Sequence, residues 1–549
     1  MKTKLLISLI AALGLTLANA DIRFKNIYQN NMVLQAGEEN AIAGKTNPEE
    51  AVELSVLAKS KDGKTMQKTL KTKADKLGKW TVKIPPFPKR TNLELTAKNA
   101  SGESARISNI ITGELWLGSG QSNMEWHFGN NTVEKEYLEK YQKDADTTNG
   151  DVRIFTANRF TLPEAIDEVC GDWRIIDGKN LRHGVSQICY IVASQLSKAL
   201  DTPVGFINSS WGGSRIEPWI SKEAFKSSGV SFNSSNNTEF KNWQEYEEFT
   251  SNYAKLREEY VKNFPKWIEQ NPTGHLQNQN RASRPQMPID ILANDHNPTN
   301  KYNSMICGVA PLSPKGVLWY QGESNAGQPY FYGDLLKLMV NSWRKHFKRD
   351  FHFYYVDLAA INDNQNQPVH HGSWGGIRET MAEVLELPKT GVATSIDSGG
   401  SKMLGIHDIH PPHKELVSTR ITKMALADVY KKGSPKAARS PRYSGEFKVE
   451  GNKLIVKIAN AEGLRKIQGK EKLTGFAIRG ENPRDWKWAD AEIKGDTIIL
   501  SSPEVSEPKA ARYAWANRPL ISVESKHGLP MLSFSTDNGA YIDWGRQKK

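Results

Sequence analysis

One stretch of the chain decides how the rest is interpreted: Glu114-Leu115-Trp116-Leu117-Gly118-Ser119-Gly120-Gln121-Ser122-Asn123-Met124-Glu125. Its first half has the pattern of a strand, and its second half places a serine beside a glycine. A glycine-flanked serine at the end of a strand can hold its hydroxyl on a tight turn above a sheet, with helix-start N–H groups near a developing oxyanion. The nucleophile elbow of α/β hydrolases requires glycine where this chain has Met124, so a different serine-hydrolase turn is predicted.

Strands and helices alternate around this stretch, from residue 109 to 437, which predicts an α/β unit with a parallel sheet. The clearest repeat is a helix with an apolar face from Ile188 to Ala199, which Asp201-Thr202-Pro203 ends before a buried strand at 204–207. Further strands are predicted at 316–320, 351–355 and 392–396, and further helices at 335–347 and 377–387.

The two ends of the chain have a different pattern, in which short alternating apolar runs are separated by turn residues. Residues 21–108 predict a small β-sandwich, and residues 438–549 predict a second β-rich unit. A helical insertion is predicted at about 220–300, because aromatic residues between Glu239 and Glu269 recur at three- and four-residue spacing. The segment 271–300 is rich in Asn, Pro and Gln and predicts loop.

The first twenty residues have the pattern of a cleaved secretory signal. Lys2 and Lys4 precede an apolar run, and Ala18-Asn19-Ala20 forms a small-x-small cleavage site. The run is too short for a membrane span, and no later segment is long and apolar enough for one. We therefore expect residues 1–20 to be removed and the protein to be exported to the periplasm or the extracellular space.

Composition narrows the possible partners. The formal charge is +12, or +10 without the leader, but the lysines and arginines are scattered, so nucleic-acid binding is not indicated. Cys170, Cys189 and Cys307 allow at most one disulfide, match no zinc pattern, and are interpreted as small buried residues. The composition indicates no oligomeric state.

A serine nucleophile needs a base, and the best candidate is His410 in His407-Asp408-Ile409-His410-Pro411-Pro412. The two prolines fit the first turn of a helix that follows, which places His410 on a loop before it. Asp408, two residues earlier, could orient the imidazole. A metal site at the clustered histidines has no supporting ligand pattern, so no metal or other cofactor is expected.

Two more segments follow predicted strands, where an open α/β sheet binds its ligands. The first is Gln321-Gly322-Glu323-Ser324-Asn325: Gln321 or Asn325 could donate to an oxyanion, and Glu323 could orient the histidine. The second is Trp211-Gly212-Gly213-Ser214-Arg215, whose glycines would let a backbone N–H approach a bound carbonyl. Taken singly, both segments also fit loops held by internal hydrogen bonds and tight turns.

Together these segments resemble the sialate O-acetylesterase family of the SGNH (GDSL-like) hydrolases, over most of the mature chain. The resemblance implies an SGNH-hydrolase-like parallel sheet flanked by N-terminal and C-terminal β-rich domains. It also implies roles for single residues: Ser122 as nucleophile, His410 as base, Asp408 as its partner, and as oxyanion donors the N–H groups of Ser122 and of Gly212 or Gly213 with the Gln321 side chain. The chain has Asp-x-His where many SGNH enzymes have Asp-x-x-His, so Glu323 remains a rival acid.

The expected function is that of an exported carbohydrate O-acetylesterase with a Ser-His-Asp mechanism, an acetyl-serine intermediate and an O-acetylated glycan as substrate. Arg215 could pair with the carboxylate of sialic acid, or make a structural ion pair. Trp211, Trp319 and Trp374 are predicted on loops near the site, where sugars could stack. The alternatives are an acetylxylan or other plant-glycan acetylesterase, and a non-catalytic glycan-binding protein, which the presence of both Ser122 and His410 disfavours.

Overall fold

The computed structural model describes residues 21–234, 238–270, 296–362, 364–369, 373–399, 409–546 and 548. The predicted signal sequence and most of the predicted loop at 271–300 lie outside these ranges. So do His407 and Asp408.

A central sheet of seven strands forms the middle of the molecule, in the order β10-β9-β11-β8-β14-β15-β16. All neighbouring pairs are parallel except β10 with β9. Its strands are β8 (Ser104–Gly120), β9 (Val152–Ala157), β10 (Gly171–Ile175), β11 (Val204–Ser210), β14 (Gly316–Tyr320), β15 (His352–Val356) and β16 (Thr390–Ala393). In chain order, β9, β10 and β11 lie on one side of β8, and β14, β15 and β16 lie on the other. Open α/β sheets bind ligands where the strand order reverses in this way, and Ser122 lies two residues beyond the end of β8.

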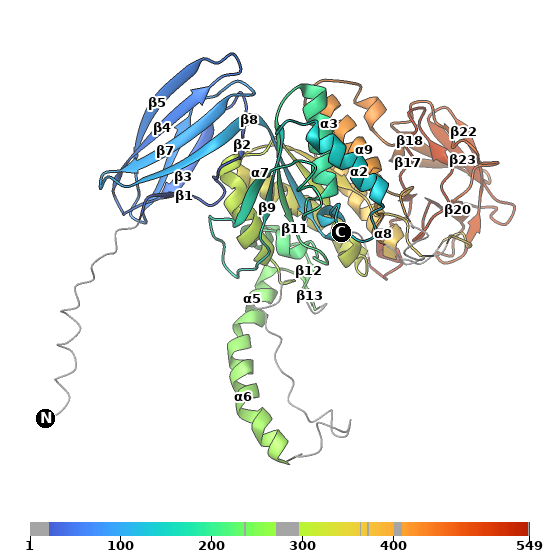
Figure 1. Cartoon of the computed structure of the whole chain (residues 1–549). Helices are drawn as coiled ribbons and strands as arrows, with labels where there is room; N and C mark the ends of the chain where they lie inside the picture. Colours follow the sequence, from blue (N-terminus) through green and yellow to red (C-terminus); the bar gives the residue numbers. More distant parts are fainter. Residues whose placement is uncertain are drawn as a thin grey trace.

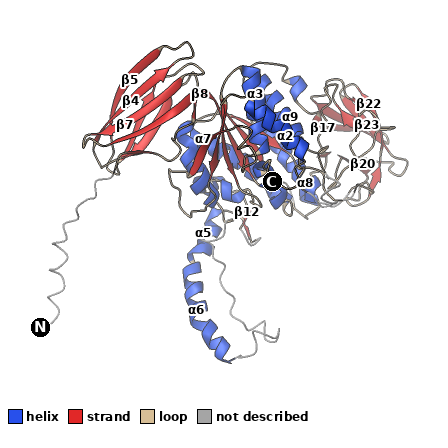
Figure 2. Ribbon diagram, viewed as in Figure 1, coloured by secondary structure: helices blue, strands red, loops and turns tan. Residues whose placement is uncertain are grey.

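Two layers of helices cover the sheet, because successive strand residues point to opposite faces and both faces are apolar. Trp116 and Leu318 face one core, with α3 (Gln187–Leu200) and α9 (Glu415–Asp428), while Leu117 and Trp319 face the other, with α7 (Tyr332–Phe347) and α8 (Ser373–Ala382). Figure 2 shows the helices on both sides of the strands. The remaining helices of the described chain are α1 (Ser122–Glu125), α2 (Lys135–Asp146), α4 (Lys222–Ser228), α5 (Trp243–Ser251), α6 (Tyr253–Gln270) and α10 (Gly539–Ile542).

The N-terminal region is built from two sheets, one of which shares the strand β8 with the central sheet. The first half of β8 pairs with β7, which pairs with β4 and through it with β5. A three-stranded sheet, β1-β3-β6, packs against this layer, and β2 runs parallel to β8. The bounds are β1 (Arg23–Phe24), β2 (Val33–Gln35), β3 (Asn40–Lys45), β4 (Ala51–Lys59), β5 (Thr65–Lys73), β6 (Lys79–Ile84) and β7 (Asn92–Asn99). The expected boundary between residues 108 and 109 therefore falls inside one continuous strand.

The C-terminal region is antiparallel β structure on the opposite side of the central sheet (Figure 1). It contains a sheet of order β17-β18-β23-β22, a sheet of order β21-β20-β24-β26, and the pair β19-β25. The bounds are β17 (Arg442–Glu450), β18 (Lys453–Ala459), β19 (Arg465–Lys466), β20 (Phe476–Arg479), β21 (Trp486–Trp488), β22 (Asp490–Lys494), β23 (Thr497–Ser501), β24 (Ala510–Tyr513), β25 (Val523–Glu524) and β26 (Phe534–Ser535).

The predicted helical insertion consists of α5 and α6, which extend away from the body of the molecule below the small pair β12 (Phe232–Asn233) and β13 (Glu239–Phe240) (Figure 1). Its base is apolar, since Trp243 and Tyr246 are buried against Phe232. In the described part of the chain, no helix combines the length and the apolar character that a membrane crossing requires.

Two local predictions are wrong. Pro411 and Pro412 precede α9 instead of opening it, because side chains satisfy the polar groups of this segment: Gln187 accepts the Lys414 N–H, and Lys414 Nζ donates to the Pro411 carbonyl. Trp319 and Trp374 do not lie on loops. Trp319 is fully buried inside β14, and Trp374 lies in α8 with its indole N–H donated to the Ala359 carbonyl.

Candidate active site

The turn after β8 requires glycine at position 120. Gly120 has φ +142°, and a Cβ there would lie 2.2 Å from the carbonyl oxygen of Tyr320 on β14. This close approach lets the Gln121 N–H donate to that same carbonyl at 2.9 Å. The chain then enters α1 at once, so Ser122 occupies the first position of a helix directly above the carboxyl end of the sheet.

The structure brings Ser122 and His410 together across 288 positions of sequence. His410 Nε2 lies 2.8 Å from Ser122 Oγ, and Ser122 as a whole is half-buried. The imidazole lies flat on the indole of Trp126, with ring centroids 4.6 Å apart and planes inclined by 13°. A serine hydroxyl within hydrogen-bond distance of a histidine nitrogen is the geometry that nucleophilic catalysis requires.

The structure describes only one of the two candidate acids for His410. Asp408 lies outside the described residues. Glu323 Oε1 accepts a hydrogen bond from Asn123 Nδ2 at 2.5 Å, and Glu323 Oε2 is buried without a hydrogen-bond partner in the part of the chain that the structure describes. Burial raises the pKa of Glu323 above its ordinary value, while its bond to Asn123 and the charge of Lys414 act in the opposite direction.

The two candidate glycines lie beside Ser122 in the loop after β11. A Cβ at Gly212 would lie 3.6 Å from the Cβ of Ser122, but the Gly212 N–H donates to Glu125 Oε2 at 2.7 Å. Gly213 is exposed with φ +73°. Within the described residues, neither the Gly213 N–H nor the Ser122 N–H donates a hydrogen bond to the protein, so both are available to a ligand.

The Gln321 side chain, in contrast, belongs to a buried network. It is fully buried, and its Nε2 donates to the Ser214 carbonyl at 3.1 Å and to Asn325 Oδ1 at 2.8 Å. Its Oε1 accepts from the Tyr332 hydroxyl at 2.7 Å. Both amide hydrogens are thus already used, and Gln321 could reach an oxyanion only by giving up one of these bonds. Asn325 extends the network to the buried carboxylate of Glu217 at 3.0 Å.

The predicted substrate-binding residues lie on the same loop as the glycines. Arg215 is half-buried, and its Nη1 donates to the Ser234 carbonyl at 3.3 Å. Its charge opposes the effect of burial, which raises the pKa of Glu217. Trp211 is half-buried, and the ammonium of Lys301 lies 3.9 Å from the centroid of its ring. Arg215 thus faces internal polar groups, and one face of Trp211 is covered by a cation.

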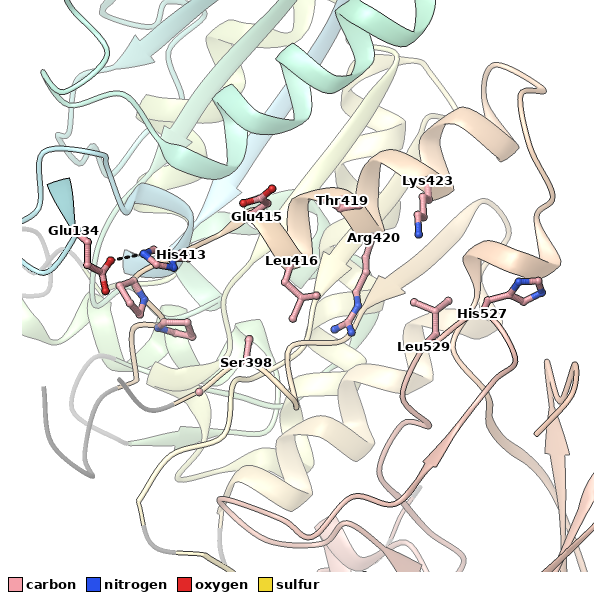
Figure 3. A pocket seen from close by; sticks show the side chains of 14 residues that line it. Glu134, Ser398, His413, Glu415, Leu416, Thr419, Arg420, Lys423, His527 and Leu529 are labelled. Atoms are coloured by element: carbon pink, nitrogen blue, oxygen red, sulfur yellow. Dashed lines mark hydrogen bonds and ion pairs between the residues drawn. The ribbon is translucent and has the colours of Figure 1, made fainter. Parts of the chain in front are cut away.

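A cleft of about 690 Å³ begins at Pro411 and Pro412, next to His410, and extends between α9 and the C-terminal loop near His527 (Figure 3). Its lining is mixed in charge. The residues labelled in Figure 3 are Glu134, Ser398, His413, Glu415, Leu416, Thr419, Arg420, Lys423, His527 and Leu529. His413 pairs with Glu134 at one end of the cleft, as the dashed line shows. In the described ranges, no three His, Cys, Asp or Glu side chains form a group that could hold a metal.

The chain is similar to known proteins over nearly its whole length. No family model matches the chain. The sialate O-acetylesterase of Mus musculus is 24% identical over 533 residues, which cover 91% of each chain. That of Homo sapiens is 23% identical over 562 residues, which cover 95% of this chain and 94% of the human one. The chain is a sialate O-acetylesterase-like carbohydrate esterase.

A solved structure agrees with the sequence relatives. The fold of this esterase matches that of a carbohydrate acetylesterase from Xanthomonas citri with a TM-score of 0.71 and 23% identity, and the match covers 94% of this chain and 99% of the other. The N-terminal sheets, the α/β unit and the C-terminal sheets of the esterase therefore recur together in that protein.

Three residues at the site of the esterase were not singled out from its sequence: Asn123, Trp126 and Lys414. Asn123 stands inside the serine motif, and Lys414 follows His410 by four positions, so their proximity in sequence was a usable signal. Nothing in the local pattern indicates that Trp126 stacks on His410, because that contact depends on where the distant His410 segment lies.

Proposed function

We propose that this protein is an exported O-acetylesterase of SGNH type that removes acetyl groups from glycans through an acetyl-serine intermediate. The observation that carries the proposal is the 2.8 Å contact between Ser122 Oγ and His410 Nε2 at the carboxyl edge of a parallel sheet. The relatives named as sialate O-acetylesterases support the choice of ester. Export rests on the leader-like residues 1–20 and predicts a mature protein beginning at Asp21.

In the proposed reaction, Ser122 Oγ attacks the acetyl carbonyl while His410 Nε2 takes its proton. The tetrahedral intermediate collapses, the bond to the sugar oxygen breaks, and His410 returns the proton to that oxygen. Water then attacks the acetyl-serine by the same route, releasing acetate and restoring the hydroxyl. Asp408 is proposed as the carboxylate that orients His410.

The proposed oxyanion donors are the N–H groups of Ser122 and Gly213. Ser122 stands at the first position of α1, where an N–H group has no partner within the helix. Gly213 follows the neighbouring strand β11, and its N–H has no protein partner in the described structure. Two backbone donors are pre-positioned by the fold and need no side-chain rearrangement when charge develops.

The proposed substrate is O-acetylated sialic acid, and acetylated xylan or another plant glycan is the alternative. Arg215 supports the anionic sugar, because it places a cation two residues beyond Gly213, in the loop that follows β11.

The test is release of acetate from a panel of O-acetylated sialic acid, acetylated xylan and acetylated pectin. We expect the fastest release from sialic acid, and loss of that preference in Arg215→Ala. Equal turnover by Ser122→Ala would refute the mechanism, and faster turnover of octanoyl than acetyl esters would refute the acetylesterase assignment.

A further inference from the structure

The segment that carries His410 is held on both sides by side-chain donors. Asn123 Nδ2 donates to the Ile409 carbonyl at 2.9 Å, immediately before His410. Lys414 Nζ donates to the Pro411 carbonyl at 2.7 Å, immediately after it. Two consecutive prolines follow His410 and lack N–H groups, so this segment cannot be fixed by regular backbone pairing of its own.

The two donors are also joined to each other. Lys414 Nζ donates to Asn123 Oδ1 at 2.5 Å, and Asn123 Nδ2 reaches Glu323 Oε1 at the same distance. Asn123 is 0% exposed and Lys414 only 1% exposed. We call Asn123, Glu323 and Lys414 the clamp. Its members come from three separate parts of the sequence: the start of α1, the segment after β14, and the segment before α9.

Burying this cation is costly, so its place in the fold needs a reason. The ammonium of Lys414 lies 5.5 Å from the ring centroid of Trp126 and 5.6 Å from that of Tyr320. Cation–π contacts and hydrogen bonds offset part of the desolvation cost, but an apolar side chain of similar size would avoid that cost altogether. The clamp therefore fixes the position of the segment around His410, although burying the Lys414 charge lowers the free energy of unfolding.

The geometry that it secures is that of the catalytic base. Trp126 fixes the plane of the imidazole by stacking, and the clamp fixes the backbone on either side of His410. A displacement of about 1 Å at a reacting group can lower a rate by roughly 10²-fold. The Asn123 and Lys414 donors thus fix the two carbonyls that flank His410, and with them the position of Nε2 beside the Ser122 hydroxyl.

We propose that Lys414 is a positioning residue for His410, acting through Asn123, and that Glu323 anchors Asn123 instead of serving as the acid of the histidine. This inference rests on the proposed function, because it assumes that His410 is the base that activates Ser122. Lys414 touches neither substrate nor the reacting atoms in this assignment.

The test compares Lys414→Met with Lys431→Met in hydrolysis of 4-nitrophenyl acetate. Lys431 is an exposed lysine just beyond α9 whose Nζ likewise donates to a carbonyl, that of Asp428 at 2.6 Å. We expect Lys414→Met to lower kcat by roughly 10- to 100-fold with KM nearly unchanged, and Lys431→Met to match the wild type. Asn123→Asp, nearly isosteric but lacking the two N–H donors, should repeat the loss if Lys414→Met does not fold.

The same substitution made in His410→Ala protein distinguishes the positioning of His410 from a general structural effect. In His410→Ala protein, Lys414→Met should cause no further loss of residual activity, because the group that it positions is gone. The same loss in both backgrounds, or wild-type kcat in the folded Lys414→Met and Asn123→Asp variants, would overturn the inference while leaving the proposed function intact. Wild-type activity in His410→Ala itself would overturn both.

Discussion

Lys414 and Arg512 are both fully buried cations beside aromatic rings, but their partners differ in kind. Arg512, in β24, is 0% exposed and lies 4.5 Å from the ring centroids of Trp486 and Trp515. Asp543 accepts two of its hydrogen bonds, at 3.0 and 3.1 Å, and Asp537 accepts further ones. The charge of Arg512 is thus neutralised directly.

The described hydrogen bonds of Lys414 go instead to the neutral oxygens of Asn123 and Pro411. Glu323 contacts Asn123, and among the described residues its other carboxylate oxygen has no hydrogen-bond partner. This difference distinguishes two roles of a buried cation, one in the fold and one in the active site. A cation paired with its own carboxylates joins elements of the fold, whereas a cation that donates to amide and backbone oxygens beside a nucleophile serves the site.

The largest expected effect on activity comes from the nucleophile. Ser122→Ala should lower kcat by at least roughly 10³-fold, because the remaining groups supply only binding and oxyanion stabilisation. Its melting temperature should stay close to that of the wild type, since the half-buried hydroxyl carries little of the core. Measured acetate release and a thermal melt check both parts. A large fall in Tm would show that Ser122 also stabilises the fold.

The choice of acid comes next. Asp408→Asn should lower kcat by roughly 10²- to 10⁴-fold if that carboxylate orients His410, whereas Glu323→Gln should cost only about tenfold, because glutamine can still accept from Asn123. Both variants would be assayed on the same acetyl ester across pH. A larger loss for Glu323→Gln would reverse the assignment and turn the clamp into part of the catalytic triad.

Arg512→Met should act on stability instead. It removes the Arg512 cation from the buried carboxylates of Asp543 and of Asp537, which keeps its ion pair with Arg479, and breaking such a buried pair costs about 3–5 kcal/mol of unfolding free energy. The activity of the folded fraction should remain within about twofold of the wild type. Denaturant unfolding combined with active-site titration measures both quantities. An unchanged free energy of unfolding with a reduced kcat would show that Arg512, like Lys414, acts on the active site.

The last prediction concerns the pH dependence of stability and Glu379 of α8, whose carboxyl feels the charge of Arg512. Burial raises the pKa of Glu379 to about 8, against the opposing effects of the Ala540 N–H and Arg512. Because the folded pKa exceeds the unfolded value, this carboxyl stabilises the fold most below pH 4.5, and that contribution is lost as pH rises towards 8. Glu379→Gln should therefore gain in Tm relative to the wild type between pH 5 and 8. A pH-independent difference in Tm would contradict the shift.

The parts predicted from the sequence are those that depend on local pattern. The helix of α3 with the strand β11, the strands β14 and β15, and the pairing of a serine turn with a distant histidine all follow from periodicity and short motifs. The clamp could not be predicted, since its three members meet only after the sheet has formed. The start of α9 was misplaced because Gln187 and Lys414 satisfy polar groups that a helical turn would otherwise have used.

The shared strand β8 has a consequence for how the molecule unfolds. Its first half completes the N-terminal sheet, its second half is the middle of the central sheet, and it ends at Gly120, next to Ser122. Local unfolding of either sheet would therefore disrupt the same strand of seventeen residues. The two regions should melt in one cooperative transition, and a truncation before residue 109 would expose the edge of the strand that delivers the nucleophile.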